Sequence, residues 1–257
     1  MRDILMRYYC ILVPVYQLTL EKSEFLQRVL SVLQPQHFIL HFDGPSGYYD
    51  ALCFSQSCQN TASTEIHLLH SDNQQLGEDG SRYQMLEYMR TQQLLATAPS
   101  TAIGLTLDDD GENSIEDAEQ IFQCLTTSSV ELCFGNYSKV WKALNFRNIA
   151  SYVYHRQFRT FGITSAPTFC GFRVAVLERC YSKPRVRWQC TLLMEARTAT
   201  EIHCRLQDLT TSTYSFFKLI TIFFENPFRI LSKKQQKRPK LFRVLFETTP
   251  INNRQTL

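Results

Sequence analysis

The feature that most constrains this fold is an alternation of strand-like and helix-like segments through the first 125 residues. An apolar run rich in aromatic and β-branched residues predicts a strand buried on both faces over residues 8–16, and further strands are predicted over residues 37–42, 65–70 and 102–107. Apolar residues at helical spacing predict helices over residues 23–33, 82–98 and 114–125. The resulting order predicts an α/β domain with a Rossmann-like, mostly parallel sheet flanked by helices.

The pattern is less regular after about residue 130. Residues 131–146 and 150–163 are aromatic and basic and are compatible with strands or loops, while residues 187–200 suggest a helix. No internal repeat is present. We therefore expect one domain over residues 1–228, with a regular half over 1–125 and a less regular half over 126–228. Residues 229–257 form a basic tail.

Composition sets further bounds on the class of protein. An apolar fraction of 44% in 257 residues is ample for a large core. Nine cysteines without a repeated spacing are typical of reduced, mostly buried thiols, which favours a cytoplasmic protein. The apolar start contains Pro14 and no cleavage site follows it, so it is not interpreted as a signal peptide. The run over residues 214–224 is too short to span a bilayer.

Three consecutive aspartates, Asp108, Asp109 and Asp110, end the apolar run at 102–107. Like charges repel, so such a cluster is best tolerated where a cation neutralises it, and Mg²⁺ or Mn²⁺ prefers carboxylate oxygens. In an extended segment alternate side chains share a face, so Asp108 and Asp110 are predicted to bind the ion together. The alternative interpretation is an acidic loop that stabilises the start of the next helix.

Asp43 follows another predicted strand and is part of the turn sequence "DGPSG". Ligands of α/β proteins bind beyond the carboxyl ends of the strands, so one cleft is expected to hold Asp43 and the three aspartates. An ordinary turn that caps the strand is the alternative for Asp43. Ligand types that suit zinc occur at Cys53, Cys58, His67 and His70, but the spacing is unlike that of common zinc sites, and no zinc site is predicted there.

Three motifs in this order resemble the GT-A nucleotide-sugar glycosyltransferases, especially the family 2 type. "ILVPVYQ" is similar to the opening strand of that family, "FILHFDGPSG" to its second strand and Asp-Gly-Ser turn, and "LTLDDDG" to its Asp-x-Asp element. The resemblance covers residues 8–125 well and residues 126–210 loosely. It implies a GT-A fold and transfer of a sugar from a nucleoside-diphosphate donor to a hydroxyl acceptor.

The resemblance also implies roles for individual residues. Pro14 and Tyr16 would line the base pocket, and Asp43 would accept a hydrogen bond from the nucleobase. Asp108 would contact the ribose or the metal, and Asp110 would hold the Mn²⁺ or Mg²⁺ that bridges the donor diphosphate. These roles suit the chemistry, because a cation offsets the charge that develops on the departing diphosphate.

Arg82, at the start of a predicted helix, is a second candidate for contact with the donor phosphates, and a solvated helix start is the alternative. The family's Glu-Asp pair, which supplies the base in inverting members, is absent, and Gln17 replaces the usual Asn. Glu195 is the favoured base, with Glu201 as the second choice. A surface carboxylate is the alternative for Glu195.

The basic tail contains seven basic residues and no acidic residue between Arg229 and Arg243. Interleaved Phe and Leu predict contact with an anionic membrane surface, which would suit a glycan or lipid-linked acceptor and a peripheral place at the inner membrane face. A solvated terminus is the alternative. Nucleic acid is not expected as a partner, because no nucleic-acid-binding module accompanies the tail.

Two other functions remain open at this point. The first is a non-catalytic protein of the same fold that binds partners or membrane through the tail. The second is a nucleotidyltransferase, although such enzymes carry a glycine-rich loop after the first strand and "PVYQLTLEK" has no glycine.

Overall fold

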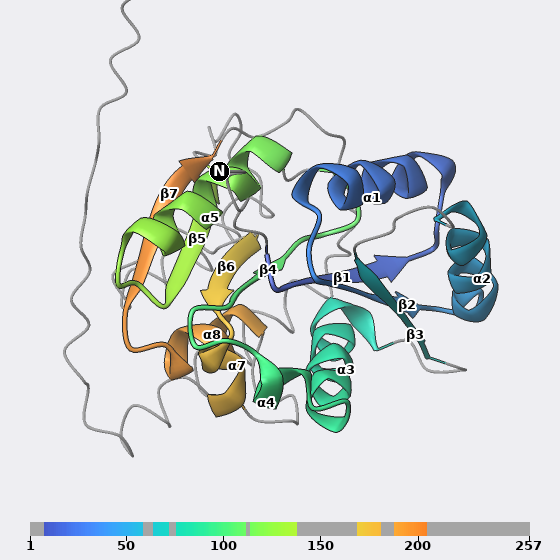
Figure 1. Ribbon diagram of the computed structural model, residues 1–257. Coiled ribbons are helices and arrows are strands. Elements are labelled where there is room, and N and C mark those ends of the chain that lie inside the picture. The colour runs from blue at the N-terminus through green and yellow to red at the C-terminus, as the bar shows by residue number, and fades with distance from the viewer. Residues whose placement is uncertain are drawn as a thin grey trace, which may run out of the picture.

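The computed structural model describes residues 8–58, 64–71, 76–111, 114–137, 169–180 and 188–204. The basic tail at 229–257 therefore lies outside the described residues. Seven strands form one sheet: β1 (Cys10–Tyr16), β2 (His37–Asp43), β3 (Glu65–His70), β4 (Ile103–Thr106), β5 (Leu132–Tyr137), β6 (Phe169–Arg173) and β7 (Ala199–Cys204). Figure 1 shows the helices on both sides of this sheet: α1 (Leu20–Leu33), α2 (Gly47–Ser57), α3 (Gly77–Thr91), α4 (Leu94–Thr97), α5 (Ile115–Thr127), α7 (Ala175–Arg179) and α8 (Trp188–Glu195).

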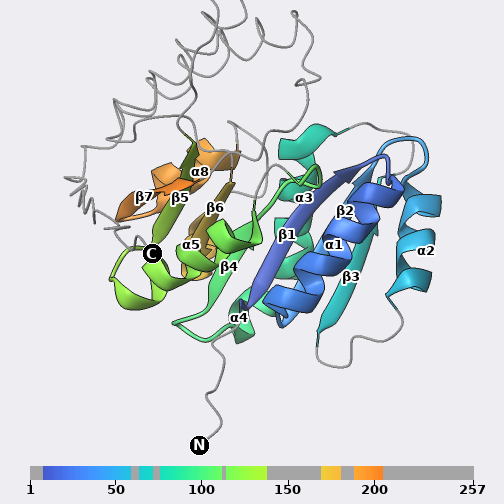
Figure 2. The same ribbon diagram turned by 90° about the horizontal axis from the view of Figure 1, so that it is seen from above.

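The strand order is β3-β2-β1-β4-β6-β5-β7. Strands β1 to β4 are mutually parallel where they pair, β6 is antiparallel to both β4 and β5, and β7 is parallel to β5. The expectation of a mostly parallel sheet flanked by helices is confirmed. Figure 2 shows the strands β1, β2 and β3 running in one direction, so their carboxyl ends lie at one edge of the sheet, which we call the carboxyl edge.

Two apolar layers cover the sheet. One layer contains side chains of α1, α2 and α5, and the other contains side chains of α3, α4, α7 and α8. Strand β1 lies between these layers with Cys10 to Val13 fully buried, which explains why its sequence is a continuous apolar run rather than an alternating one. Among the described residues, no helix is long and apolar enough to span a bilayer.

The first four predicted strands are found close to their predicted bounds, but helix α2 was not predicted. Its sequence "GYYDALCFSQS" begins inside the predicted turn, and only Gly47, Ala51 and Phe54 are buried. Two parallel neighbours such as β2 and β3 need a crossover connection, and α2 provides part of it. The predicted helix over 82–98 begins earlier, at Gly77, and is divided at Gln93, which adopts a left-handed conformation with φ of 59°.

The second half of the chain adds β5, β6 and β7 to the same sheet. The sequence of residues 131–146 is compatible with a strand or a loop, and its first part forms β5. The segment that contains Phe169 to Arg173 forms the antiparallel strand β6. The helix suggested over 187–200 is α8, which ends at Glu195. The last two residues of that range, Ala199 and Thr200, belong to β7.

Candidate active site at the carboxyl edge of the sheet

The topology creates a switch point between β1 and β4. The chain passes from β1 through α1 to β2 on one side of β1, and later returns to β4 on the other side. The pairing of β4 with β1 is limited to Cys10 to Leu12, whereas β1 continues to Tyr16. Pro14 lies in this last part of β1, where it is buried and pairs in register with His41 of β2. In open α/β sheets a ligand binds outside the carboxyl ends of the strands at such a point.

Tyr16 is the last residue of β1 and is exposed at this edge. Its backbone N–H donates to Asp109 Oδ2 over 3.0 Å, and its carbonyl oxygen accepts from Lys22 Nζ. The Lys22 ammonium also pairs with Asp109 Oδ2 at 2.8 Å. The ring of Tyr16 covers Gly44, where a Cβ atom would lie 3.1 Å from Tyr16 Cε2. Asp109 is thus held toward the α1 side of the sheet, and its neighbours fix the end of β1.

Asp43 is the last residue of β2 and is directly opposite Tyr16 in register. It is buried and accepts three hydrogen bonds: from Ser71 Oγ at 2.8 Å, from the Leu76 N–H at 3.0 Å and from the Gly77 N–H at 2.6 Å. The last two donors belong to the start of α3, where N–H groups have no partner within the helix. Asp43 therefore anchors the start of α3, and a contact with a nucleobase stays a prediction.

Arg82 of α3 contributes a buried cation to this edge. Its side chain is 1% exposed and Nη2 donates to Asp108 Oδ1. Nη1 lies 3.8 Å from Glu78 Oε2, but among the described residues nothing accepts a hydrogen bond from Nε or Nη1. A buried guanidinium with two nitrogens that make no hydrogen bond is costly, so a phosphate oxygen would be a suitable partner once a cation offsets the carboxylates of Glu78, Asp79 and Asp108 around it.

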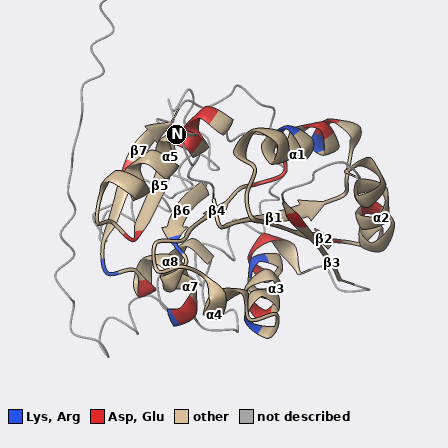
Figure 3. Cartoon of the chain, viewed as in Figure 1, with Lys and Arg blue, Asp and Glu red and all other residues tan. Residues whose placement is uncertain are grey.

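Asp108 faces Arg82 on the α3 side, while Asp109 faces Lys22 on the α1 side. Burial raises the pKa of Asp108, the Arg82 guanidinium opposes that effect, and the carboxylates of Glu78, Asp110 and Asp109 raise the pKa further. Figure 3 shows these acidic residues in the segment that follows β4 and in the first turn of α3. The negative charge at this point therefore exceeds what Arg82 balances.

The backbone is not extended through Asp108, Asp109 and Asp110, in contrast to the prediction from the sequence. Strand β4 ends at Thr106, and a turn includes Asp109 and Asp110 before Gly111, whose φ is 74°. Asp110 is exposed in this turn. The carboxylates of Asp108 and Asp110 are the donor type that Mn²⁺ or Mg²⁺ accepts, usually one or two at a time beside phosphate oxygens. The two residues thus have the donor type that such an ion needs, and their joint binding of it stays a prediction.

The structure does not bring Glu195 to the carboxyl edge. Glu195 ends α8, and its carbonyl oxygen accepts from Arg179 Nε, whose guanidinium also pairs with Glu131 at 2.6 Å. Glu131 comes directly before β5, and β5 runs in the same direction as β4 because β6 is antiparallel to both. These residues therefore lie at the opposite edge of the sheet, where the parallel strands begin, which we call the amino edge. The choice of Glu195 rested on its distance along the chain from the aspartates, and α8 runs away from them.

The pairs that build this site were not predicted from the sequence. Arg82 and Asp108 are separated by 26 residues, and Lys22 and Asp109 by 87. The signals available were the position of Arg82 near a helix start and the crowding of the aspartates. Neither signal identifies which cation meets which acid, because that depends on how α1 and α3 cross the sheet.

No family model and no curated protein sequence matches this chain. Solved structures do match its fold, and the strand order, the antiparallel β6 and the helices on both faces are those of a GT-A domain. The chain therefore has the GT-A fold, as the sequence motifs implied.

Two solved structures represent this likeness. Glucosyl-3-phosphoglycerate synthase from Mycobacterium tuberculosis, solved with Mn²⁺, uridine diphosphate and glucosyl-3-phosphoglycerate, superposes with a TM-score of 0.57 and 9% identity over 88% of this chain and 80% of its own. 4-Diphosphocytidyl-2C-methyl-D-erythritol synthase superposes with a TM-score of 0.51 and 10% identity over 85% of this chain and 98% of its own. At these identities the likeness concerns the fold alone.

Proposed function

We propose that this protein is a metal-dependent glycosyltransferase that moves a sugar from a nucleoside-diphosphate donor to a hydroxyl acceptor, with inversion at the anomeric carbon. The observation that carries the proposal is the buried Arg82 beside Asp108 at the switch point, with Nε and Nη1 unsatisfied among the described residues. A diphosphate offers the bidentate oxygens that such a guanidinium binds best. The GT-A likeness supports the same interpretation, since one neighbour was solved with uridine diphosphate and Mn²⁺.

The proposed site assigns a task to each group at the carboxyl edge. Asp108 and Asp110 would hold Mn²⁺ or Mg²⁺, and Arg82 would bind the donor phosphates. Tyr16 would stack on or border the base, with Pro14 behind it, and Asp43 keeps the start of α3 in place beside them. When bound, the metal would offset the charge that grows on the leaving diphosphate.

The reaction breaks the bond between the anomeric carbon and the diphosphate oxygen and forms a bond from that carbon to the acceptor oxygen. The acceptor proton passes to a base, and the electron pair of the broken bond leaves with the nucleoside diphosphate. Arg82 would remain charged throughout, because its pKa is raised by Asp108, Glu78 and Asp79 in spite of its burial. A cation that is already positioned stabilises the departing charge without reorganising.

The first test is calorimetry of uridine diphosphate binding with and without Mn²⁺. The parent should bind only when Mn²⁺ is present, and Asp110→Ala should weaken binding at least about tenfold, since a metal-binding carboxylate is lost. Asp110 is exposed, so the variant should fold like the parent. Glu119→Ala, which removes an exposed acid from α5, is the matched control and should bind like the parent. Equal binding by parent and Asp110→Ala would contradict the proposal.

A second experiment separates transfer from binding. A panel of nucleotide sugars is incubated with the protein and Mn²⁺, and release of nucleoside diphosphate is measured. Turnover of at least one donor is expected. Binding without release across the panel would instead favour a non-catalytic protein of this fold, the alternative that the missing Glu-Asp pair keeps open.

A nucleotidyltransferase is the second candidate, because 4-diphosphocytidyl-2C-methyl-D-erythritol synthase matches over 98% of its own chain. Such an enzyme joins a nucleoside triphosphate to a phosphate and releases pyrophosphate. The segment after β1, "QLTLEK", lacks the glycines with which those enzymes surround a triphosphate. Release of pyrophosphate from a nucleoside triphosphate and a sugar phosphate, with no release of diphosphate from nucleotide sugars, would establish this candidate instead.

A further inference from the structure

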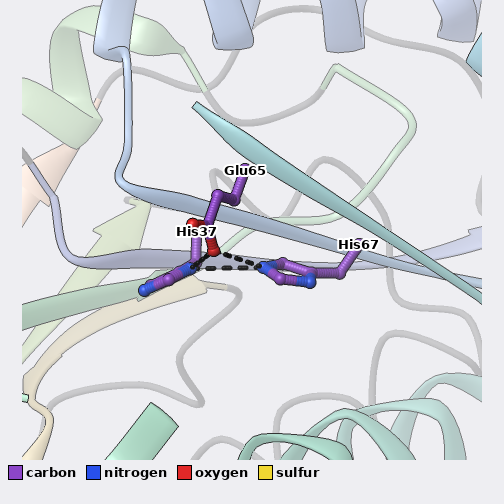
Figure 4. Close-up of side chains that lie close together, drawn as sticks. All are labelled: His37, Glu65 and His67. Carbon is purple, nitrogen blue, oxygen red and sulfur yellow. Dashed lines mark hydrogen bonds and ion pairs between the residues drawn. The ribbon is translucent and has the colours of Figure 1, made fainter. Parts of the chain in front are cut away.

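Three side chains with metal-binding atoms converge at the amino edge, on the edge strand β3 and its neighbour β2. His37 and Glu65 are the first residues of these strands and lie opposite each other in register. His67 follows Glu65 by two residues, so both project from the same face of β3. Figure 4 shows the three side chains pointing toward one another.

The distances between the three donor atoms suit a single metal ion. His37 Nδ1 lies 3.2 Å from His67 Nε2 and 3.1 Å from Glu65 Oε2, and His67 Nε2 lies 3.7 Å from the same oxygen. Ligands about 2.0–2.1 Å from a tetrahedral zinc ion are separated by about 3.3 Å. The observed separations lie on both sides of this value, so the three atoms already occupy three corners of such a site.

The surroundings also resemble those of a metal site. His67 Nδ1 is 2.9 Å from the hydroxyl of Tyr88 on α3, which fixes the orientation of the ring and leaves Nε2 directed at the cluster. The ring of Tyr9 packs edge-on against His37 at 4.9 Å between centroids.

We propose that His37 Nδ1, His67 Nε2 and the Glu65 carboxylate bind a divalent ion of the zinc class. Two imidazoles and one carboxylate are ligands that suit zinc, whereas Mg²⁺ and Mn²⁺ prefer oxygen ligands. Glu65 is 69% exposed, so the fourth position of the ion faces solvent and is available to water or a small anion. This site is separate from the carboxyl edge, where Asp108 and Asp110 lie.

The proposed ion has a structural consequence for the edge strand. It would join the amino end of β3 to that of β2, next to the backbone bond from the Glu65 N–H to the Gln36 carbonyl. Among the described residues, β3 pairs with one strand and has no fully buried side chain, so it is open to local unfolding. A ligand that binds only the folded arrangement stabilises it by mass action.

The test uses the full chain without an affinity tag, treated with a chelator and then titrated with Zn²⁺ in a calorimeter and with Co²⁺ in a spectrophotometer. The parent should bind one Zn²⁺ tightly, and Co²⁺ should give the strong visible bands of a tetrahedral site. Glu65→Gln and His67→Gln should weaken Zn²⁺ binding by about 100-fold or more, and Tyr88→Phe by about tenfold, as expected for an outer hydrogen-bond partner. Glu65 is exposed, so Glu65→Gln tests the site even if a histidine variant fails to fold.

His70→Gln is the matched control, because His70 lies on the same strand, is exposed and packs against Tyr48 instead. It should bind Zn²⁺ like the parent, as should Asp110→Ala. Binding that is unchanged in Glu65→Gln and His67→Gln, or that disappears in Asp110→Ala, would overturn the proposal and identify the three residues as a hydrogen-bonded cluster without a metal. Diphosphate binding that depends on Mn²⁺ is measured separately, so failure here leaves the proposed function untouched.

Discussion

At the scale of single residues, neighbouring aspartates of one short segment have different partners. Asp108 meets the buried Arg82, Asp109 meets Lys22 and the end of β1, and Asp110 is exposed. A carboxylate that balances a buried cation contributes to stability, whereas an exposed carboxylate contributes little. Substitutions at these three positions should therefore have distinct effects.

Asp108→Asn should lower the free energy of unfolding by about 3 kcal/mol, because it removes the carboxylate that pairs directly with Nη2 of the buried Arg82 guanidinium. Asp109→Asn should cost about 1 kcal/mol, since Lys22 is partly exposed and can reach water. Asp110→Asn should be nearly neutral. Urea denaturation of the three variants measures the order, and equal stability of Asp108→Asn and Asp110→Asn would contradict it.

His41 of β2 should make stability depend on pH. Burial lowers its pKa, Asp43 opposes this effect, and His70 adds to the lowering. The unfolded chain therefore takes up a proton at a higher pH than the folded chain does. The free energy of unfolding keeps its full value above about pH 6.5 and decreases as the pH falls through that value. Urea denaturation between about pH 8 and about pH 5.5, with chelator present, should show a smaller fall for His41→Gln than for the parent. His203→Gln, on an exposed residue of β7, should leave the fall unchanged.

At the scale of elements, the contact between β4 and β6 depends on glycine. Gly104 and Phe172 are register partners, and a Cβ atom on Gly104 would lie 2.3 Å from Phe172 Cε2 and 2.9 Å from Cys10 Sγ. The aromatic ring thus occupies the space that a side chain at 104 would need. This packing holds the antiparallel strand against the parallel half of the sheet.

Gly104→Ala should destabilise the protein by about 1–3 kcal/mol through overpacking in the core. Phe172→Leu should recover part of that loss in the double variant, because the shorter side chain vacates the contested space. A double-mutant cycle from urea denaturation measures this coupling. Additive effects of the two substitutions would show that the ring is not what excludes a side chain at 104.

At the scale of the whole molecule, one sheet joins both halves of the chain, and its two apolar layers share that sheet. Six of the nine cysteines are buried: Cys10, Cys133, Cys170, Cys180, Cys190 and Cys204. Burial raises the pKa of several of them, for example to about 12 at Cys170 and Cys180. Because the thiolate is the reactive form, these thiols are protected both by burial and by protonation.

Alkylation followed by mass spectrometry should therefore modify the exposed Cys53 first and the half-buried Cys58 and Cys124 more slowly. The six buried thiols should become reactive together as urea unfolds the protein, because both apolar layers pack on the same sheet. Cys133 and Cys204 belong to one layer, and the other four belong to the second. Reaction of one layer well before the other would indicate that the packing on the two faces of the sheet is lost in separate steps.

The fold class and the regular first half could be predicted from the sequence because buried strands and amphipathic helices have local signatures. Apolar runs identified β1, β2 and β4, the segment "EIHLLH" suggested β3, and the motifs of β1, β2 and the aspartate segment indicated the GT-A fold. The weaker elements could not be predicted in the same way. Helix α2 buries few residues, and β5 and β6 are defined mainly by their pairing with distant strands.

The sequence by itself determined that acidic residues follow the strands of a mostly parallel sheet, since strand ends and charges are both local features. Only the tertiary structure decided that Arg82 meets Asp108, that Glu195 lies at the other edge, and that His37 faces Glu65 and His67. The physical reason is that these relations depend on strand register and on the direction in which helices cross the sheet. Both are set by packing between segments far apart in the chain, which no local pattern records.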